Sequence, residues 1–294
     1  MTPIEPQAPR APIETGAPER APSVTRLRAA AALLALVILA ALLAPWLAPQ
    51  APSALDLDRR LAKPSPQHPL GQDELGRDIL SRLLFGARAS LATGLAVVLL
   101  AGALGTVIGG LAGIVGGRVD ALLMRLVDVV LAFPGLLLAI ALVAMLGPAL
   151  SHVVLALVLI GWVGYARLVR GQAARLRESE FVLAARASGA GWVRVFLVHV
   201  LPNLAPLLLV QASLSMAGAM LAEASLSFLG LGLQPPTPSW GAMVNAGRGH
   251  LLDAPHLALL PGLALCVVVA CLNVAADALG ERLQGRRAIP AGLD

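Results

Sequence analysis

The strongest constraint on this 294-residue chain is a succession of apolar runs, several of them about 20 residues long. A helix of that length crosses the hydrocarbon core of a bilayer. Hydrophobic residues make up 57% of the chain and charged residues 13%, which is more apolar surface than a soluble domain can bury. Aromatic residues make up only 3%, and no run alternates as the strands of a membrane barrel do. The sequence therefore predicts an all-α polytopic membrane protein.

Six runs are interpreted as transmembrane helices. The first is long for a cleaved signal peptide and is expected to remain as a span, with cleavage as the alternative. The fourth is short, and if it were re-entrant every later loop would change sides. The expected spans are residues 29–48, 89–117, 126–146, 153–166, 204–222 and 257–276.

The remaining segments are more polar. Residues 1–28 are rich in Pro and Ala without hydrophobic periodicity, which predicts a disordered cytoplasmic tail. Residues 49–88 carry balanced charges and are expected to form an external loop that ends in an amphipathic helix. Residues 89–283 form the membrane core with a cytoplasmic loop at 167–202, and residues 284–294 form a second cytoplasmic tail.

The basic residues predict the orientation of the spans. If the N-terminus is cytoplasmic, the cytoplasmic segments hold more than twice as many Arg and Lys residues as the external ones. Most of the external exceptions lie in the charge-balanced residues 49–88. Both termini are therefore expected inside. Because the arginines flank apolar runs and lack stacking aromatic neighbours, they indicate topology control and contact with a lipid bilayer, with no nucleic-acid binding.

Several kinds of chemistry lack sequence support. Lys63 is the only lysine, so the chain has no P-loop to hold ATP. Cys266 and Cys271 lie in one apolar run but on different helix faces, as packing residues would. The five histidines have no neighbouring partner in a known metal-binding spacing. We expect this chain to contain no catalytic residue, bound metal or cofactor.

Two features point to contacts between helices or with a partner. Gly105, Gly109 and Gly113 share one helix face and allow close approach of a helix from this chain or from a partner chain. Residues 167–202 hold six arginines, each costing about 2.5 to 3.5 kcal/mol at the bilayer centre, so this segment is expected outside lipid. Within it, residues 181–189 predict a short helix whose apolar face docks into a partner groove. The alternative is a helix lying on the membrane surface.

Four motifs resemble one transporter family. Residues 180–189 (EFVLAARASG), followed by LPN at 201–203, resemble the E-A-A-x-x-x-G…L-P loop of ABC importer permeases. Over about residues 68–283 the chain is similar to the C-type permease subunit of dipeptide, oligopeptide and nickel importers. The motifs that narrow the resemblance are HPLGQDELGRD at 68–78, RLVD and AFP at 125–128 and 132–134, and EASLSFLGLG and PPTPSWG at 223–232 and 235–241.

The resemblance implies the type I ABC importer permease fold in the inner membrane of a bacterium. Its implied partners are a second permease subunit in a heterodimer, two cytoplasmic ABC ATPase subunits and an external solute-binding protein. ATP and Mg²⁺ would bind to the ATPases, so this chain is expected not to be an enzyme. The expected solute is a di- or oligopeptide, with nickel or another small solute as the alternative. A stand-alone secondary transporter is less supported, because the two halves share no motif.

The resemblance also assigns site residues. In that family the E-A-A loop forms a coupling helix that sits in a groove of the ATPase. Leu183 replaces the glutamate of the motif, so the docking is expected to depend on apolar contacts. The implied coupling residues are Glu180, Phe181, Leu183, Ala184, Ala185, Arg186, Gly189 and Pro202, and the external motif supplies Gly71, Asp73, Gly76, Arg77 and Asp78.

Five residues are candidates for the pathway or an external loop. Asp128 and Glu223 lie near predicted span ends, where they would either face a water-filled pathway or pair with an arginine or a helix cap. Ser227, Phe228 and Trp240 flank a proline-rich stretch. That stretch is expected to form a stiff external loop near the pore or the binding-protein dock, or else only a connection between spans.

Overall fold

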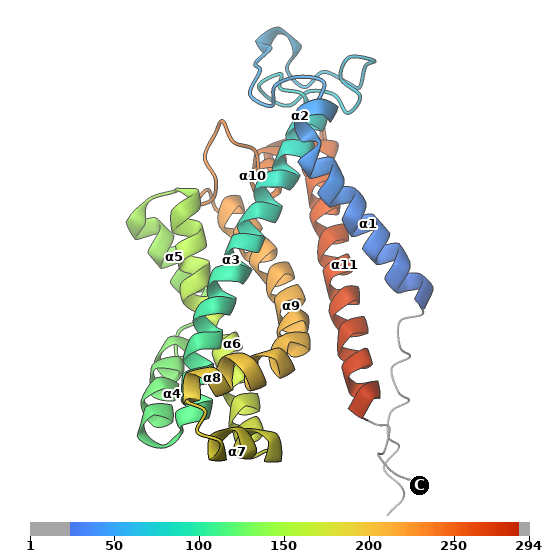
Figure 1. Ribbon diagram of the computed structural model, residues 1–294. Helices are drawn as coiled ribbons and strands as arrows, with labels where there is room; N and C mark the ends of the chain where they lie inside the picture. Colours follow the sequence, from blue (N-terminus) through green and yellow to red (C-terminus); the bar gives the residue numbers. More distant parts are fainter. Residues whose placement is uncertain (1–23, 288–294) are drawn as a thin grey trace, which may run out of the picture.

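The computed structural model describes residues 24–287, which fold into a bundle of helices (Figure 1). Within this range no strand forms, and the one β interaction is an isolated bridge between Gln72 and Asp78. Short helical turns occur at Leu57–Arg59, Val195–Val200 and Arg248–His250. The helices are α1 (Val24–Leu42), α2 (Ala44–Leu47), α3 (Ile79–Val115), α4 (Gly117–Leu131), α5 (Gly135–Leu146), α6 (Leu150–Arg177), α7 (Glu180–Ala187), α8 (Trp192–Arg194), α9 (Leu201–Phe228), α10 (Trp240–Gly247) and α11 (His256–Arg287).

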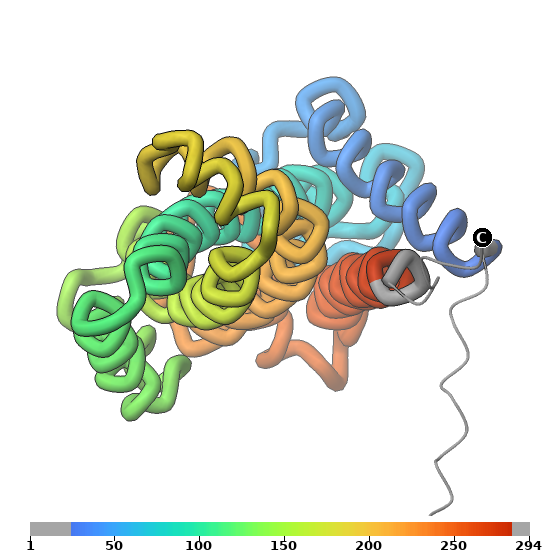
Figure 2. The backbone as a smooth tube through the Cα atoms, turned by 60° about the horizontal axis from the view of Figure 1, so that its bottom comes forward, coloured from blue at the N-terminus to red at the C-terminus, as the bar shows by residue number. Residues whose placement is uncertain are grey.

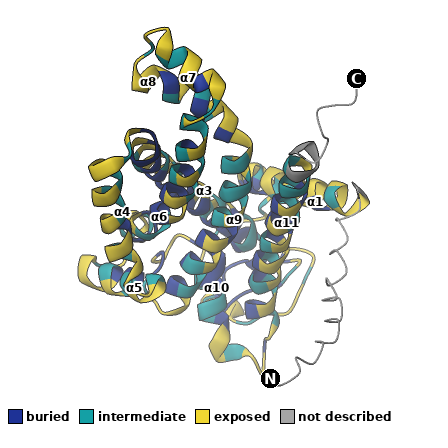
Figure 3. Ribbon diagram, turned by 90° about the horizontal axis from the view of Figure 1, so that it is seen from below, coloured by how far each residue is buried: buried dark blue, intermediate teal, exposed yellow. Residues whose placement is uncertain are grey.

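In the described part of the chain, five helical stretches are long and apolar enough to cross a membrane. They are most of α1, all of α3 and α6, the stretch Trp192–Phe228 that contains α9, and most of α11. The pair α4 and α5 passes the same test together, which gives up to six spans. Many leucines on these helices are exposed, and exposed positions follow α1, α4 and α5 (Figure 3). Such surfaces suit lipid, and the all-α polytopic class is confirmed.

The first predicted span differs from the structure at both ends. The helix starts at Val24, so residues 24–28 are helical and do not belong to a disordered tail. The rest of that predicted tail, residues 1–23, lies outside the described residues. The run 29–48 is divided, because α1 ends at Leu42 and a separate helix α2 starts at Ala44 with Pro45 in its first turn. Proline cannot donate the backbone hydrogen bond that would continue α1.

Three other helices extend beyond their apolar runs. The predicted amphipathic helix and the run 89–117 form one helix, α3, of 37 residues. At 1.5 Å per residue α3 is about 55 Å long, which exceeds the bilayer core. α6 has 28 residues and continues from the short fourth run through Arg167 to Arg177, so it is long enough to span. α11 continues to Arg287, into the predicted tail 284–294, of which residues 288–294 lie outside the described range.

The third predicted span, 126–146, is broken. α4 ends at Leu131 and α5 starts at Gly135, and the two helices are bent by 79° relative to each other. Pro134 precedes α5 as its N-cap, with extended backbone. Proline disfavours helical geometry in the residue before it, and it lacks the N–H that would bond back to Val130. The expected single span is therefore divided into two helices at Pro134.

The glycine face of α3 packs against α6 of the same chain. A Cβ atom on Gly105, Gly109 or Gly113 would lie 2.3 to 2.6 Å from a backbone oxygen of α6. The two helix backbones therefore touch along this stripe, as small residues allow in membranes. The sequence left open whether these glycines contact a helix of this chain or of a partner chain. In the structure they contact α6 of this chain.

The helices divide into two sides of the bundle. α1 and α11 lie together on one side, and α4 and α5 lie on the opposite side, with α3, α6 and α9 between them (Figures 1 and 2). The first residues of α1, the last residues of α11 and the segment α7–α8 are at the same end, while α2 and residues 49–78 are at the other (Figure 1). The N-in, C-in orientation remains a prediction, with which this arrangement agrees.

Candidate functional site

At the lower end of the bundle, α7 is a short helix with a well-defined end. Its last turn closes with hydrogen bonds from the N–H of Ala190 to the carbonyl of Ala185 and from the N–H of Gly189 to the carbonyl of Arg186. Gly189 has φ +86°, a conformation that residues with a Cβ rarely adopt. This is the Schellman arrangement. The assigned Gly189 therefore stops the helix and turns the chain toward α8.

One side chain anchors α7 to the bundle. Val182 is fully buried in a cluster that joins the end of α3 (Ile114), α6 (Val169), the π-helical turn (Val195) and the start of α9 (Leu204). Ala185 is partly buried against the same cluster. The predicted loop 167–202 is thus a folded unit that is attached to three spans.

The outer surface of α7 is apolar and open. Phe181 and Leu183 are 44% and 56% exposed, and Ala184 and Glu180 are exposed beside them. In Figure 3, α7 and α8 project away from the rest of the bundle. Leu183, which replaces the glutamate of the motif, lies on this open surface, so the substitution adds apolar area.

Arg186 fixes the segment that follows α7. Its guanidinium lies 4.0 Å from the ring centre of Trp192, and its Nη1 donates to the carbonyl of Ala190 at 2.6 Å. A cation over an indole face is a favourable contact. Arg186 is therefore engaged within the segment, which disfavours a role as a free lipid anchor for α7.

Pro202 lies where the loop returns to the membrane. The π-helical turn Val195–Val200 leads directly into α9, and Pro202 is in the first turn of α9. Pro202 has no N–H to donate, and the side chain of Asn203 donates to the carbonyl of His199 at 2.6 Å. The LPN motif thus joins the loop to α9 directly after a π-helical turn. Such turns are frequent at functional sites.

At the other end of the bundle, the external motif residues form a buried polar cap. Asp73 is its centre, because one carboxylate oxygen accepts from the backbone N–H groups of Leu75 and Arg77 and the other contacts the Nε atoms of Arg77 and Arg82 at 2.7 and 3.3 Å. Gly71 and Gly76 have φ +83° and +70°. A Cβ on Gly76 would collide with the carbonyl of Asp56, so the loop needs glycine there.

Asp78 joins this cap to α3. It is the N-cap of α3 and accepts from the backbone N–H and the hydroxyl of Ser81, both at 2.7 Å. Its second oxygen lies 2.9 Å from Nδ1 of His68. All three side chains are buried. The five predicted external residues are therefore brought together, with His68, Ser81 and Arg82 as partners that sequence reasoning left unassigned.

Glu223 connects three elements near the same end. It is 1% exposed in α9, and it accepts from the hydroxyl of Ser227 at 2.7 Å and from that of Ser90 in α3 at 3.4 Å. The backbone N–H of Trp240 donates to Ser90, and the indole N–H donates to the carbonyl of Leu83. Among the alternatives considered for Glu223, the structure favours neither an arginine partner nor a helix cap, because serine hydroxyls satisfy it.

The other two candidates lie apart. Asp128 in α4 is half exposed and pairs with Arg167 of α6 at 2.8 Å, which agrees with the predicted arginine partner. Phe228 lies 5.2 Å below the guanidinium of Arg248. A mainly apolar recess of about 260 Å³ opens among α3, α5, α6 and α9, and neither residue lines it.

Sequence reasoning missed the buried polar partners for a definable reason. Ser90 lies among apolar residues, and its role depends on a hydrogen bond to Glu223, which is 133 positions away in the chain. The one available signal was the clustering of serines beside Glu223, at 225 and 227. Arg82 was expected in the external loop and amphipathic helix of residues 49–88 and was given no role, whereas the structure buries it against Asp73.

The chain matches known transport proteins over most of its length. Residues 105–289 match the family described as "Binding-protein-dependent transport system inner membrane component". The nickel transport system permease protein NikC of Escherichia coli K12 is 46% identical over 257 residues, which is 87% of this chain and 93% of NikC. The probable D,D-dipeptide permease protein DdpC of the same strain is 42% identical, covering 86% of this chain and 85% of DdpC. The di/tripeptide permease protein DppC of Pseudomonas aeruginosa UCBPP-PA14 is 43% identical, covering 84% of each. With a polytopic helical bundle and all four motifs in place, the chain belongs to the family of inner membrane components of binding-protein-dependent transport systems, as an ABC importer permease of the peptide and nickel group.

Proposed function

We propose that this chain forms half of the translocation pathway of an ATP-driven importer and couples it to cytoplasmic ATPases through α7. The observation that carries the proposal is the open apolar surface of Phe181, Leu183 and Ala184 on a helix whose opposite side is held by Val182. An exposed apolar face on a firmly anchored helix suits a protein groove. The implied assembly contains a second permease subunit, two ATPases that bind ATP and Mg²⁺, and an external solute-binding protein in a bacterial inner membrane.

The coupling role is tested by Ala184→Arg. Ala184 is exposed on α7, so a larger side chain disturbs a docked partner while leaving the buried contacts of Val182 in place. Ala185 is less suitable because it is partly buried. Loss of about 1.4 kcal/mol at the interface corresponds to about a tenfold weaker assembly. We expect stimulation of ATP hydrolysis by the binding protein, and uptake, to fall by about that factor.

The matched control is Ala54→Arg, which places the same side chain on the exposed external loop. Both variants should insert into the membrane in normal amounts. Normal coupled transport in the Ala184→Arg variant would contradict docking through α7. A weakened assembly in both variants would show that the effect is not specific to α7.

For the solute, we propose a di- or oligopeptide as the first candidate and nickel as the second. The peptide permeases DdpC and DppC support the first, and the similarity to NikC supports the second. Binding of short peptides and of Ni²⁺ to the solute-binding protein that stimulates this importer distinguishes the two. Peptide binding without Ni²⁺ binding would support the first candidate, and the reverse result would refute it.

A further inference from the structure

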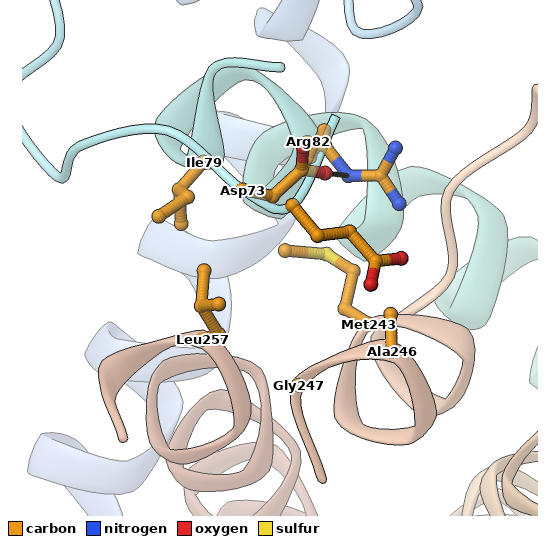
Figure 4. Close-up of a pocket in the computed structure, with 8 residues that line it drawn as sticks. Asp73, Ile79, Arg82, Met243, Ala246, Gly247 and Leu257 are labelled. Carbon is orange, nitrogen blue, oxygen red and sulfur yellow. Dashed lines mark ion pairs between the residues drawn. The ribbon is translucent and has the colours of Figure 1, made fainter. Parts of the chain in front are cut away.

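The external end of the protein holds two hollows that share the side chains of Glu74 and Arg82. The smaller one, about 20 Å³, has Ile79, Met243 and Leu257 as an apolar wall, and Figure 4 shows the ion pair of Asp73 and Arg82 at its edge. The larger one has a volume of about 270 Å³ and lies between the external cap, residues 230–237 and α10. Only the larger hollow has room for more than a water molecule.

Arg82 lines both hollows and also carries an unsatisfied donor. Its side chain is 7% exposed, and its Nε contacts Asp73 at 3.3 Å. Within residues 24–287, its Nη1 atom is buried without a hydrogen-bond partner. Most buried side-chain polar atoms in folded proteins have at least one hydrogen-bond partner, so a missing acceptor is informative.

The neighbouring acids are already engaged. Asp73 serves two guanidinium groups and two backbone N–H groups at once. Glu74 also lines the larger hollow, but its Oε2 lies 3.3 Å from Nε2 of His250. Two arginines therefore share the carboxylate of Asp73, and Nη1 of Arg82 is left without an acceptor among the described residues. One further carboxylate would give the guanidinium of Arg82 the acceptor that it lacks.

We propose that the larger hollow binds a carboxylate group, with Arg82 as the main donor and with Arg77 and Asn245 beside it on the lining. A guanidinium presents parallel N–H donors that match the two oxygens of a carboxylate. The carboxylate has two possible sources: an acidic side chain of the docked solute-binding protein, or a carboxylate of the solute as it is released. The identity of the source rests on the proposed transport role, whereas carboxylate binding itself does not.

Acetate is a direct probe of the hollow. The assembled importer, without binding protein, is heated in acetate and in chloride at equal ionic strength. We expect acetate to raise the Tm of the wild type and of Arg88→Gln, a matched change at an exposed arginine of the same helix. Arg82→Gln should lose this difference. An equal acetate effect in Arg82→Gln and the wild type, or none in the wild type, would overturn the proposal.

Asn245→Asp provides a second variant in case Arg82→Gln fails to fold. It places a carboxylate on the lining of the hollow. We expect this variant to be at least as stable as the wild type in chloride and to show no further gain in acetate. A variant that is less stable and still gains from acetate would contradict the assignment.

Reconstituted vesicles then distinguish the two sources. If the binding protein supplies the carboxylate, Arg82→Gln should raise, by about tenfold, the binding-protein concentration that half-saturates ATP hydrolysis, with the maximal rate unchanged. If the solute supplies it, that concentration stays constant while uptake per ATP hydrolysed falls. Either result supports the site, and unchanged values of both quantities would overturn its role in the importer.

Discussion

The contact between α3 and α6 allows a sharp test, since one substitution should have opposite effects at two glycines. In Gly109→Ala the new Cβ would lie 2.3 Å from the carbonyl oxygen of Ala166 and 2.9 Å from its Cα. That oxygen belongs to the backbone of α6 and cannot rotate away. The helices must therefore separate by several tenths of an ångström or more.

The magnitude follows from two opposing effects. Overpacking of a well-packed contact costs about 1 to 3 kcal/mol. Replacing glycine by alanine inside a helix contributes up to about 1 kcal/mol in the stabilising direction. Gly171→Ala in α6 is the matched control, because no atom lies within 4 Å of its new Cβ. We expect Gly109→Ala to be less stable than Gly171→Ala by about 1 to 3 kcal/mol.

Unfolding of the purified protein in detergent, followed by tryptophan fluorescence, measures this difference. Trp162 is a suitable reporter, since it is 4% exposed and its carbonyl oxygen faces Gly105. Gly105→Ala should also destabilise. The double variant Gly105→Ala/Gly109→Ala should lose less stability than the sum, because one displacement of α3 relieves both clashes. Equal stability of Gly109→Ala and Gly171→Ala would refute direct backbone contact.

Two further predictions concern topology and ion pairs. In a cysteine-free background, single cysteines at Lys63 and Arg186 should react with an impermeant thiol reagent from opposite sides of the membrane, and labelling from one side would refute the orientation. Asp120→Asn should destabilise the protein by about 1 kcal/mol or more, since Arg170 donates two hydrogen bonds to this carboxylate at 2.9 and 2.6 Å. Asp128→Asn, which removes a half-exposed pair with Arg167, should change stability by less than about 0.5 kcal/mol in the same unfolding assay. Equal effects of the two variants would contradict this difference.

The sequence predicted the existence of the helices better than their limits. In lipid, an apolar run of 20 residues can satisfy its backbone hydrogen bonds only as a helix. The runs alone therefore predicted the all-α membrane class. The limits depend on interactions that hydropathy does not contain. α3 continues through Arg82 because Asp73 neutralises it, and α6 continues through Arg170 because Asp120 of α4 pairs with it. Arg170, which lay in the predicted loop 167–202, is thus held inside a helix by a partner 50 positions away in the chain.

The site residues show the same distinction. Residues 181–189 predicted a short helix, and the structure has α7 there, followed by Gly189 with a positive φ. The role of Val182 was missed, because its burial depends on Ile114, Val169 and Val195 from other parts of the chain. Likewise, Glu223 could be placed near a span end, but its partner Ser90 depends on the packing of α9 against α3, whereas its partner Ser227 lies one turn away in α9. The end of a helix can be predicted from neighbouring residues, whereas the burial of a side chain depends on residues far away in the chain.

The packing also indicates how a movement of α7 would reach the outside. Val182 ties α7 to α3, α6 and α9, and the glycine stripe holds α3 and α6 in backbone contact. A densely packed interior transmits displacement with little compression. At the far end, Ser90 of α3, Glu223 of α9 and the backbone of Trp240 are joined by hydrogen bonds. We therefore expect α3, α6 and α9 to move as one unit, so that a shift of α7 appears outside as a displacement of α10 and the external hollow.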